Sequence, residues 1–113
     1  MPSRSMGGAM AIGFYRKVHV KEDRSDRFEA LLQSYISAVL DEEPGCTFLT
    51  YLRSPTDPLL FTLHEEYADE RALDQHRNGD LEKLWLPVLM RHVATVTVSR
   101  FAVADEDEVM APS

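Results

Sequence analysis

The sequence of 113 residues predicts one α+β domain: a ferredoxin-like β-α-β-β-α-β chain with a four-stranded antiparallel sheet. Three observations lead to this prediction. Four segments have the apolar alternation, or the β-branched and aromatic content, that is typical of strands. The stretch after the first of them repeats its apolar residues every three or four positions, as an amphipathic helix does. The middle two strands are separated only by the turn SPTDP, which is short enough for a hairpin.

The first strand is expected in AIGFYRKVHV, residues 11–20. Its alternation places five side chains on one face: Ile12, Phe14, Arg16, Val18 and Val20. A long helix follows, with seven apolar residues at helical spacing: Phe28, Leu31, Leu32, Tyr35, Ile36, Val39 and Leu40. We expect Asp23, Ser25 or Asp26 to cap the start of this helix, and Pro44-Gly45 to end it.

The second and third strands are expected at residues 46–53 and 59–67. Strict alternation in the second strand separates Cys46, Phe48, Thr50 and Leu52 from Thr47, Leu49, Tyr51 and Arg53. The face that carries Leu49, Tyr51 and Leu60 would expose an apolar patch, because the predicted helices cover only one side of the sheet. The same face of a second copy, related by a two-fold axis, would cover this patch, so we expect a homodimer.

Two short helices are expected before the last strand. Asp69 is a candidate N-cap for the first, and Asn78-Gly79 ends it. Asp80 is expected to cap the second, and Pro87 predicts a bend or a change of helix inside it. The apolar positions of this second helix are Leu81, Leu84, Trp85, Val88 and Leu89. The last strand is expected in VATVTVSRFAV, which begins at Val93.

Composition and charge limit the classes of partner. Residues 1–9 are expected to be a flexible leader, 10–103 the domain, and 104–113 a flexible acidic tail. The formal net charge is −7, with four negative charges from the run DEDE at 105–108, and no basic patch predicts nucleic-acid binding. Since no apolar run is long enough to span a bilayer and no signal peptide is evident, we expect a cytoplasmic protein without a membrane partner. Cys46 is the only cysteine, so no intrachain disulfide is possible.

Four stretches carry a resemblance to a known family: EEPGC at 42–46, RSPTDP at 53–58, FTLHEEYAD at 61–69 and ERALDQH at 70–76. In their order and spacing the chain resembles the antibiotic biosynthesis monooxygenase family of dimeric α/β barrels, over about Gly13 to Phe101. The resemblance implies ferredoxin-like dimers with a pocket between the sheet and the helices of each subunit. Activities in this family include oxygenation of polycyclic phenols or quinols without metal or flavin, haem degradation, and isomerisation of a small phosphorylated sugar-like signal.

Two departures from the family pattern narrow the range of activities that the resemblance implies. Leu81 stands where many members carry a second histidine, five positions after the one that matches His76. The haem-degrading branch has a tryptophan in place of His76 and a histidine in place of Leu86. Haem chemistry is therefore disfavoured.

His76 is the first candidate for catalysis. It follows Leu73 by three residues and Ala72 by four, so a helix turns it toward its apolar side. An imidazole titrates near neutral pH and suits proton abstraction, although a histidine hydrogen-bonded at the edge of the core is the alternative. Glu65 is the second catalytic candidate. It could orient His76 or pair with Arg71 or Arg16, and structural pairing is the more common use of a buried carboxylate.

Four aromatic residues are candidates to bind a flat substrate: Tyr67, Trp85, Phe48 and Tyr35. Core packing is the more frequent use of such side chains. The chain has no zinc-type ligand spacing, no HExxH, no glycine-rich phosphate loop and no GxGxxG, so neither a metal nor another cofactor is expected.

Residues and resemblance together favour a cofactor-independent monooxygenase that acts on an aromatic or quinone-like small molecule. His76 would remove a proton from a phenol or quinol, and the resulting anion would react with dioxygen directly. An isomerase that moves a proton through His76 is a close variant. A non-catalytic homodimer that binds a small molecule, and a purely structural dimer without a cavity, are the alternatives.

Overall fold

The computed structural model describes residues 10–103, and the expected leader at 1–9 and acidic tail at 104–113 lie outside this range. The elements follow in this order: β1 (Ile12–Val20), α2 (Ser25–Glu42), β2 (Cys46–Arg53), β3 (Leu60–Tyr67), α3 (Glu70–Arg77), α4 (Asp80–Met90) and β4 (Val93–Ala102). The strands form one antiparallel sheet in the order β2-β3-β1-β4. This topology confirms the predicted ferredoxin-like fold, with its second helical region divided into two helices.

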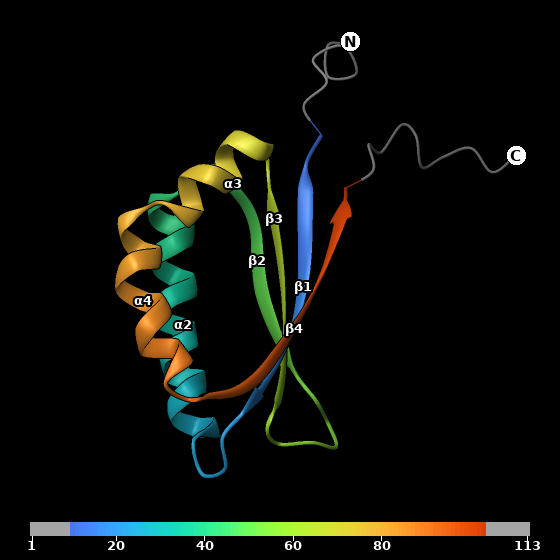
Figure 1. Ribbon diagram of the computed structural model, residues 1–113, viewed down its shortest axis with the longest axis vertical. Coiled ribbons are helices and arrows are strands. Elements are labelled where there is room, and N and C mark those ends of the chain that lie inside the picture. Colours follow the sequence, from blue (N-terminus) through green and yellow to red (C-terminus); the bar gives the residue numbers. More distant parts are fainter. Residues whose placement is uncertain (1–9, 104–113) are drawn as a thin grey trace, which may run out of the picture.

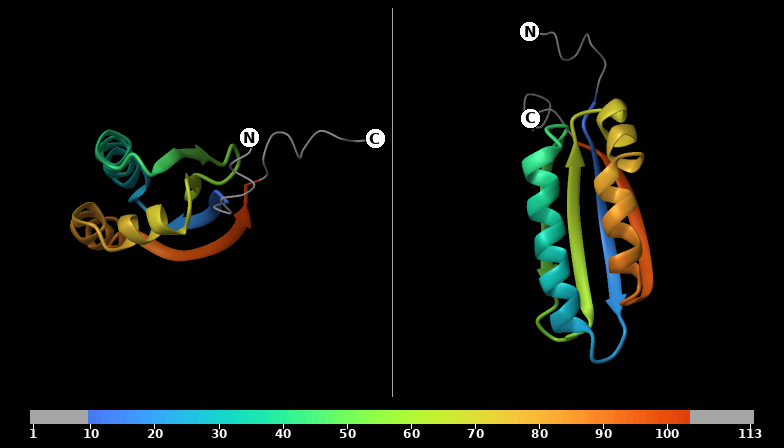
Figure 2. Two further views of the ribbon diagram at one scale, coloured as in Figure 1. Left: turned by 90° about the horizontal axis from the view of Figure 1, so that it is seen from above. Right: turned by 90° about the vertical axis from the view of Figure 1, so that its left-hand side faces the viewer.

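The helices lie on one face of the sheet and leave the other face bare (Figure 1). Helices α2 and α4 run side by side along the strands (Figure 2). Among the described residues, the hydrophobic core contains eight side chains that are at most 2% exposed: Phe14, Val20, Phe28, Leu32, Val39, Phe61, Tyr67 and Leu73. Their positions confirm the apolar faces predicted for β1 and α2, and they account for much of the favourable burial in this small domain.

A register shift in β2 decides which side chains face the helices. Cys46 pairs with Tyr67 while Phe48 pairs with the preceding residue of β3, so that Thr47 is an extra residue in the ladder. Cys46 and Leu49 are therefore both buried on the helix side, and Phe48 is 42% exposed on the bare face. The strict alternation predicted for β2 is wrong because a bulge moves every later side chain to the opposite face.

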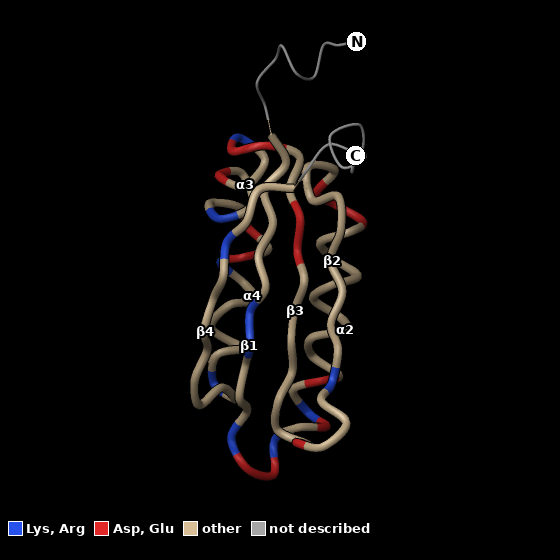
Figure 3. The backbone as a smooth tube through the Cα atoms, turned by 90° about the vertical axis from the view of Figure 1, so that its right-hand side faces the viewer, with Lys and Arg blue, Asp and Glu red and all other residues tan. Residues whose placement is uncertain are grey.

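The bare face has an exposed aromatic cluster, formed by Tyr15, Phe48, His64 and Phe101. The ring centroids of Tyr15 and His64, and of Phe48 and His64, are 4.7 Å apart, and those of Tyr15 and Phe101 are 4.9 Å apart. Figure 3 shows this side of the sheet, with the helices behind it. The predicted apolar patch thus exists, but Phe48 and Leu52 contribute to it in place of Leu49 and Tyr51.

The ends of α2 and α3 differ in how they are capped. The Asp69 side chain accepts a hydrogen bond from the Ala72 N–H at 2.8 Å, which confirms the predicted cap of α3. Helix α2 begins after Arg24, and no side-chain hydrogen bond caps it. The predicted α2 cap is therefore wrong, and Ser25 Oγ donates instead to the carbonyl of Pro58 at 3.0 Å.

Helix α4 continues through Pro87 to Met90, so of the two alternatives predicted at this proline the change of helix is excluded and the bend stays a prediction. Its N-cap residue is Gly79, one position before the predicted Asp80. Leu84, which was expected on the buried side, is 64% exposed. None of the helices between residues 10 and 103 is long and apolar enough to cross a membrane.

Candidate active site

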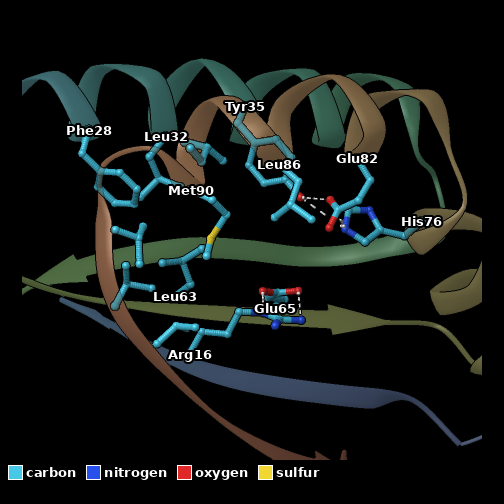
Figure 4. Close-up of a pocket in the computed structure, with 14 residues that line it drawn as sticks. Arg16, Phe28, Leu32, Tyr35, Leu63, Glu65, His76, Glu82, Leu86 and Met90 are labelled. Atoms are coloured by element: carbon cyan, nitrogen blue, oxygen red, sulfur yellow. Dashed lines mark hydrogen bonds and ion pairs between the residues drawn. The ribbon is translucent and has the colours of Figure 1, made fainter. Parts of the chain in front are cut away.

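A cavity of about 280 Å³ lies between the sheet and the helices α2 and α4. Its polar lining residues are Arg16, Tyr35, Glu65, His76 and Glu82, and its apolar ones are Val18, Phe28, Leu32, Leu63, Leu86, Leu89, Met90, Val93 and Val96. Figure 4 shows the side chains of Tyr35, Glu82 and His76 close together at one end, while those of Phe28 and Leu32 lie farther along. The cavity thus has a polar end near α3 and an apolar end.

His76 stands at the polar end, on the buried side of α3 together with Ala72 and Leu73. This placement confirms the orientation predicted from the spacing. The imidazole lies between two carboxylates: Nδ1 is 2.5 Å from Glu43 Oε1, and Nε2 is 3.2 Å from Glu82 Oε1. Glu43 is the C-cap residue of α2, and Glu82 belongs to the first turn of α4. Two helix ends therefore hold the histidine of a third helix.

The two carboxylates determine the charge of the histidine. Burial lowers the pKa of His76, but hydrogen bonds and attraction to Glu82 and Glu43 outweigh burial, so the pKa lies above its ordinary value of 6.5. Burial raises the pKa of Glu82, but the hydrogen bond and the positive charge of His76 outweigh it, so this pKa lies below 4.5. An imidazolium–carboxylate pair is thus the favoured state between these two pKa values.

Tyr35 completes this polar end from α2. Its Oη donates to Glu82 Oε1 at 2.9 Å and lies 3.2 Å from His76 Nε2. Burial and the charge of Glu82 raise the pKa of Tyr35, so its hydroxyl stays protonated. When the imidazole is neutral with its proton on Nδ1, Nε2 is an acceptor that a hydroxyl can approach. The position of the Tyr35 oxygen marks a place where a hydroxyl reaches Nε2 of His76.

Arg16 and Glu65 form an ion pair on the sheet side of the cavity. Arg16 Nε donates to Glu65 Oε2, Arg16 Nη2 lies 3.5 Å from Glu65 Oε1, and Tyr67 Oη donates to that same oxygen at 2.8 Å. Among the partners considered for Glu65, the structure selects Arg16 and not His76 or Arg71. The Glu65 side chain is only 7% exposed, and a buried carboxylate needs a partner for its charge. Arg16 is that partner.

The structure brings three of the six predicted site residues, His76, Glu65 and Tyr35, into the cavity wall. Tyr67 is buried with its ring centroid 5.1 Å from that of His76, and Trp85 packs against Tyr35 at 6.2 Å, so both support the wall without lining it. Phe48 lies on the bare face of the sheet, where the bulge in β2 directs it. The expectation that Phe48 lines the cavity is wrong for this reason.

Sequence reasoning missed Glu43 and Glu82 as partners of His76. Both stand at helix ends among other charged residues, where a carboxylate commonly faces solvent. The one signal for Glu43 was its position in EEPGC, directly before the turn that ends α2. Nothing in the local pattern around Glu82 distinguishes it from the neighbouring charges.

Within residues 10–103, no group of three or more His, Cys, Asp or Glu side chains is arranged to hold a metal ion. Cys46 is buried, and burial raises the pKa of its thiol to about 11. A thiol with this pKa is a poor nucleophile near neutral pH.

A profile of antibiotic biosynthesis monooxygenases matches residues 12–85, which span β1 to α4 and include His76 and both its carboxylate partners. The chain belongs to this family. The match confirms the resemblance inferred from the sequence motifs. No curated protein matches the chain in sequence.

Several solved structures have the same fold. A candidate antibiotic biosynthesis monooxygenase from Caulobacter crescentus superposes with a TM-score of 0.81 at 21% identity, over 86% of this chain and 92% of that one. A second, from Bacteroides thetaiotaomicron, has a TM-score of 0.75 at 20% identity, over 86% and 90%. A conserved protein from Methanosarcina mazei has a TM-score of 0.75 at 28% identity, over 86% and 96%.

Proposed function

We propose that this chain is a monooxygenase that acts on a small aromatic molecule of the phenol or quinol type. The observation that carries the proposal is a histidine held between two carboxylates at the polar end of an otherwise apolar cavity. Membership in the antibiotic biosynthesis monooxygenase family supports oxygenation as the reaction. His76 is the base, and the substrate anion reacts with dioxygen without a metal or flavin.

The cavity favours a small, neutral substrate. Its volume of about 280 Å³ is at the lower end of ligand pockets, which run from roughly 300 to 1,000 Å³, so one or two rings fit better than a large polycycle. The apolar end can hold the ring, and the polar end can hold its hydroxyl. When His76 is neutral, the cavity wall has the two carboxylates of Glu65 and Glu82 against the one guanidinium of Arg16, so phosphorylated or carboxylated substrates are disfavoured.

The chemical step begins with His76 neutral and its proton on Nδ1. The substrate hydroxyl donates its proton to Nε2, and the two flanking carboxylates stabilise the imidazolium that forms. The electron-rich aromatic anion then transfers an electron to dioxygen, and the two radicals combine in a carbon–oxygen bond. One oxygen atom stays in the product. The other leaves as water with the two hydrogens that the substrate has lost, so no external reductant is needed.

We also propose that two copies pack their bare sheet faces together. Tyr15, Phe48 and Leu52 are exposed there by 43%, 42% and 61%, and the four-ring aromatic cluster makes this patch continuous across the sheet. A second copy buries the same residues on both subunits, because a two-fold interface is self-complementary. The cavity lies on the opposite side of the sheet, so each subunit keeps its own site.

A second candidate function is non-catalytic binding of a small aromatic molecule. The observation that favours it is that, within residues 10–103, every buried polar side-chain atom already has a hydrogen-bond partner. A site whose polar groups satisfy one another can serve structure and binding without turnover. An isomerase that moves a proton through His76 would use the same geometry, again on a neutral substrate.

The test is oxygen uptake by protein freed of metal and flavin, with a panel of hydroquinones and anthrones. Wild type is compared with His76→Ala and with His19→Ala, the same change at an exposed histidine outside the cavity. We expect uptake above the protein-free rate in wild type and His19→Ala, and its loss in His76→Ala. Ring binding that raises the melting temperature, with no uptake from any compound, would contradict the monooxygenase and support the binding protein.

A further inference from the structure

The imidazole of His76 separates two spaces in the molecule. On one side is the cavity, and on the other is an outer hollow of about 170 Å³, lined by Glu42, Glu43, Gln75 and residues around the turn that ends α2. His76 is the one residue common to the walls of these two spaces. Nε2 meets Tyr35 and Glu82 of the cavity, while Nδ1 meets Glu43 of the hollow. The two nitrogens therefore serve different spaces.

The Glu43 carboxylate contacts the imidazole of His76 and is partly exposed to solvent. Its Oε1 lies 2.5 Å from Nδ1, the separation of a short, charge-assisted hydrogen bond. Its side chain is 19% exposed, whereas that of His76 is 5% exposed, so water reaches the carboxylate more readily than the ring. The backbone N–H of Glu43 donates to the Val39 carbonyl at 2.8 Å and fixes the residue at the end of α2.

We propose that Glu43 and His76 form a proton path between the cavity and solvent, in which Glu43 is a positioning residue that acts through the histidine. The proposal rests on the proposed function, because the proton that uses the path comes from the substrate hydroxyl. Nε2 takes this proton, and Nδ1 passes its own proton to Glu43, which releases it to water in the hollow. The imidazole is then neutral with its proton on Nε2. It gives that proton to the oxygenated anion while Nδ1 regains one from solvent through Glu43, which completes the cycle.

Among residues 10–103, the other charged and titratable groups around the ring make no hydrogen bond to Nδ1, and Glu82, whose side chain is 21% exposed, meets the ring only at Nε2. These groups are Tyr35 and Glu82 on the cavity side, Tyr67 and Glu65 of β3, Arg16 of β1, Cys46 of β2, and Asp74 and Arg77 on α3 itself. Glu65 is bound to Arg16 and Tyr67, and Tyr35 donates to Glu82. In the part of the chain that the structure describes, Glu43 is the sole hydrogen-bond partner of Nδ1.

The test measures how fast the Nδ1 proton of His76 exchanges with water, by NMR on protein labelled with ¹⁵N-histidine. Glu43→Gln keeps an oxygen that accepts the hydrogen bond but cannot take the proton. We expect exchange to slow by roughly 100-fold, the lower end of what a positioned general base contributes. Glu42→Gln, which removes the same charge from the same hollow, is expected to leave the rate unchanged. Equal rates in the two variants, or a wild-type Nδ1 without a proton, would overturn the path.

Two further measurements keep the test decisive. Glu43→Asp retains an acid and is expected to restore part of the exchange rate, and failure of this rescue would count against proton transfer through the carboxylate. If a compound in the oxygen-uptake panel is a substrate, its turnover gives a second measurement. Glu43→Gln is expected to lower kcat with little change in KM, whereas Glu42→Gln is expected to change neither. The exchange measurement needs no turnover, so it separates failure of the path from failure of the proposed monooxygenase.

Discussion

His76 Nε2 and Glu82 Oε1 lie 3.2 Å apart at the polar end of the cavity, on two helices joined by Asn78 and Gly79. The short connection matters because it brings the last turn of α3 against the first turn of α4. A carboxylate at this position raises the pKa of the histidine, and the histidine lowers that of the carboxylate. The pair therefore stabilises the imidazolium, which is the form that a substrate hydroxyl would produce by donating its proton to Nε2.

The first prediction concerns the stability of this pair. Because the pKa of His76 is raised in the folded state, its ionisation stabilises the fold. This contribution to the free energy of unfolding is full below the unfolded-state pKa of 6.5 and is lost as the pH rises through the folded-state pKa. The lowered pKa of Glu82 also contributes to the free energy of unfolding. This contribution is present above the unfolded-state pKa of 4.5 and is lost as the pH falls through the folded-state pKa. A double-mutant cycle of His76→Gln and Glu82→Gln, measured by urea unfolding, should give about 1–3 kcal/mol of coupling near pH 5.5. Coupling of the same size at about pH 9 would contradict this assignment.

The second prediction concerns the hydroxyl of Tyr35. Tyr35→Phe keeps the ring but removes the hydrogen bond to Glu82, so we expect the pKa of Glu82 to rise and the unfolding free energy to fall by about 1 kcal/mol. A ¹³C NMR titration of the Glu82 carboxylate measures the first effect. Tyr51→Phe, which removes the hydroxyl that donates to Glu29, is the matched control and should leave Glu82 unchanged. Identical titrations in both variants would show that Tyr35 does not act on Glu82.

The third prediction concerns the charge preference of the cavity. Glu65→Gln releases Arg16 from its ion pair, so the affinity for a carboxylate ligand such as benzoate should rise about tenfold, while that for phenol should change little. Isothermal titration calorimetry measures both ligands. Glu66→Gln is the control, because it removes the same charge from the next residue of β3. The Glu66 side chain pairs with His64 on the bare face, outside the cavity. An unchanged ratio of benzoate to phenol affinity in Glu65→Gln would remove the charge argument against anionic substrates.

The fourth prediction concerns the bare face. Leu52→Glu places a charge in the proposed interface and should convert the wild-type dimer into a monomer in sedimentation equilibrium. Leu84→Glu is matched in chemistry and in exposure, 64% against 61%, but lies on α4, and the dimer should survive it. A wild type that sediments as a monomer would refute the proposed interface.

Much of the fold could be predicted from the sequence because its signals are local. The observed bounds of β2 are the predicted 46–53. The apolar spacing of α2 included its four buried side chains, Phe28, Leu32, Tyr35 and Val39, but also Leu40, which is 47% exposed. The bulge at Thr47 could not be predicted, since alternation has no means to detect an extra residue in a ladder. This single residue moved Phe48 out of the cavity and Leu49 into the core.

The site was predictable only in part, because its key contacts join residues that are far apart in sequence. The helical spacing of Ala72, Leu73 and His76 was enough to predict that the histidine faces the interior. Its hydrogen bond to Glu43 spans 33 residues, and that of Tyr35 to Glu82 spans 47. Such pairs depend on how α2 ends and on where α4 begins, which no local pattern reports.

The measurement that tests the central claim most directly is the pH dependence of kcat/KM for oxygen uptake, in wild type and in Glu82→Gln. This quantity reports the pKa values of the free enzyme. If neutral His76 is the base, the rate rises with pH through the raised pKa of His76, and loss of the Glu82 charge moves the rise to lower pH. The account predicts this shift, after subtraction of the protein-free rate at each pH. A profile that falls with pH, or one that Glu82→Gln leaves in place, would contradict the claim that His76 removes the substrate proton.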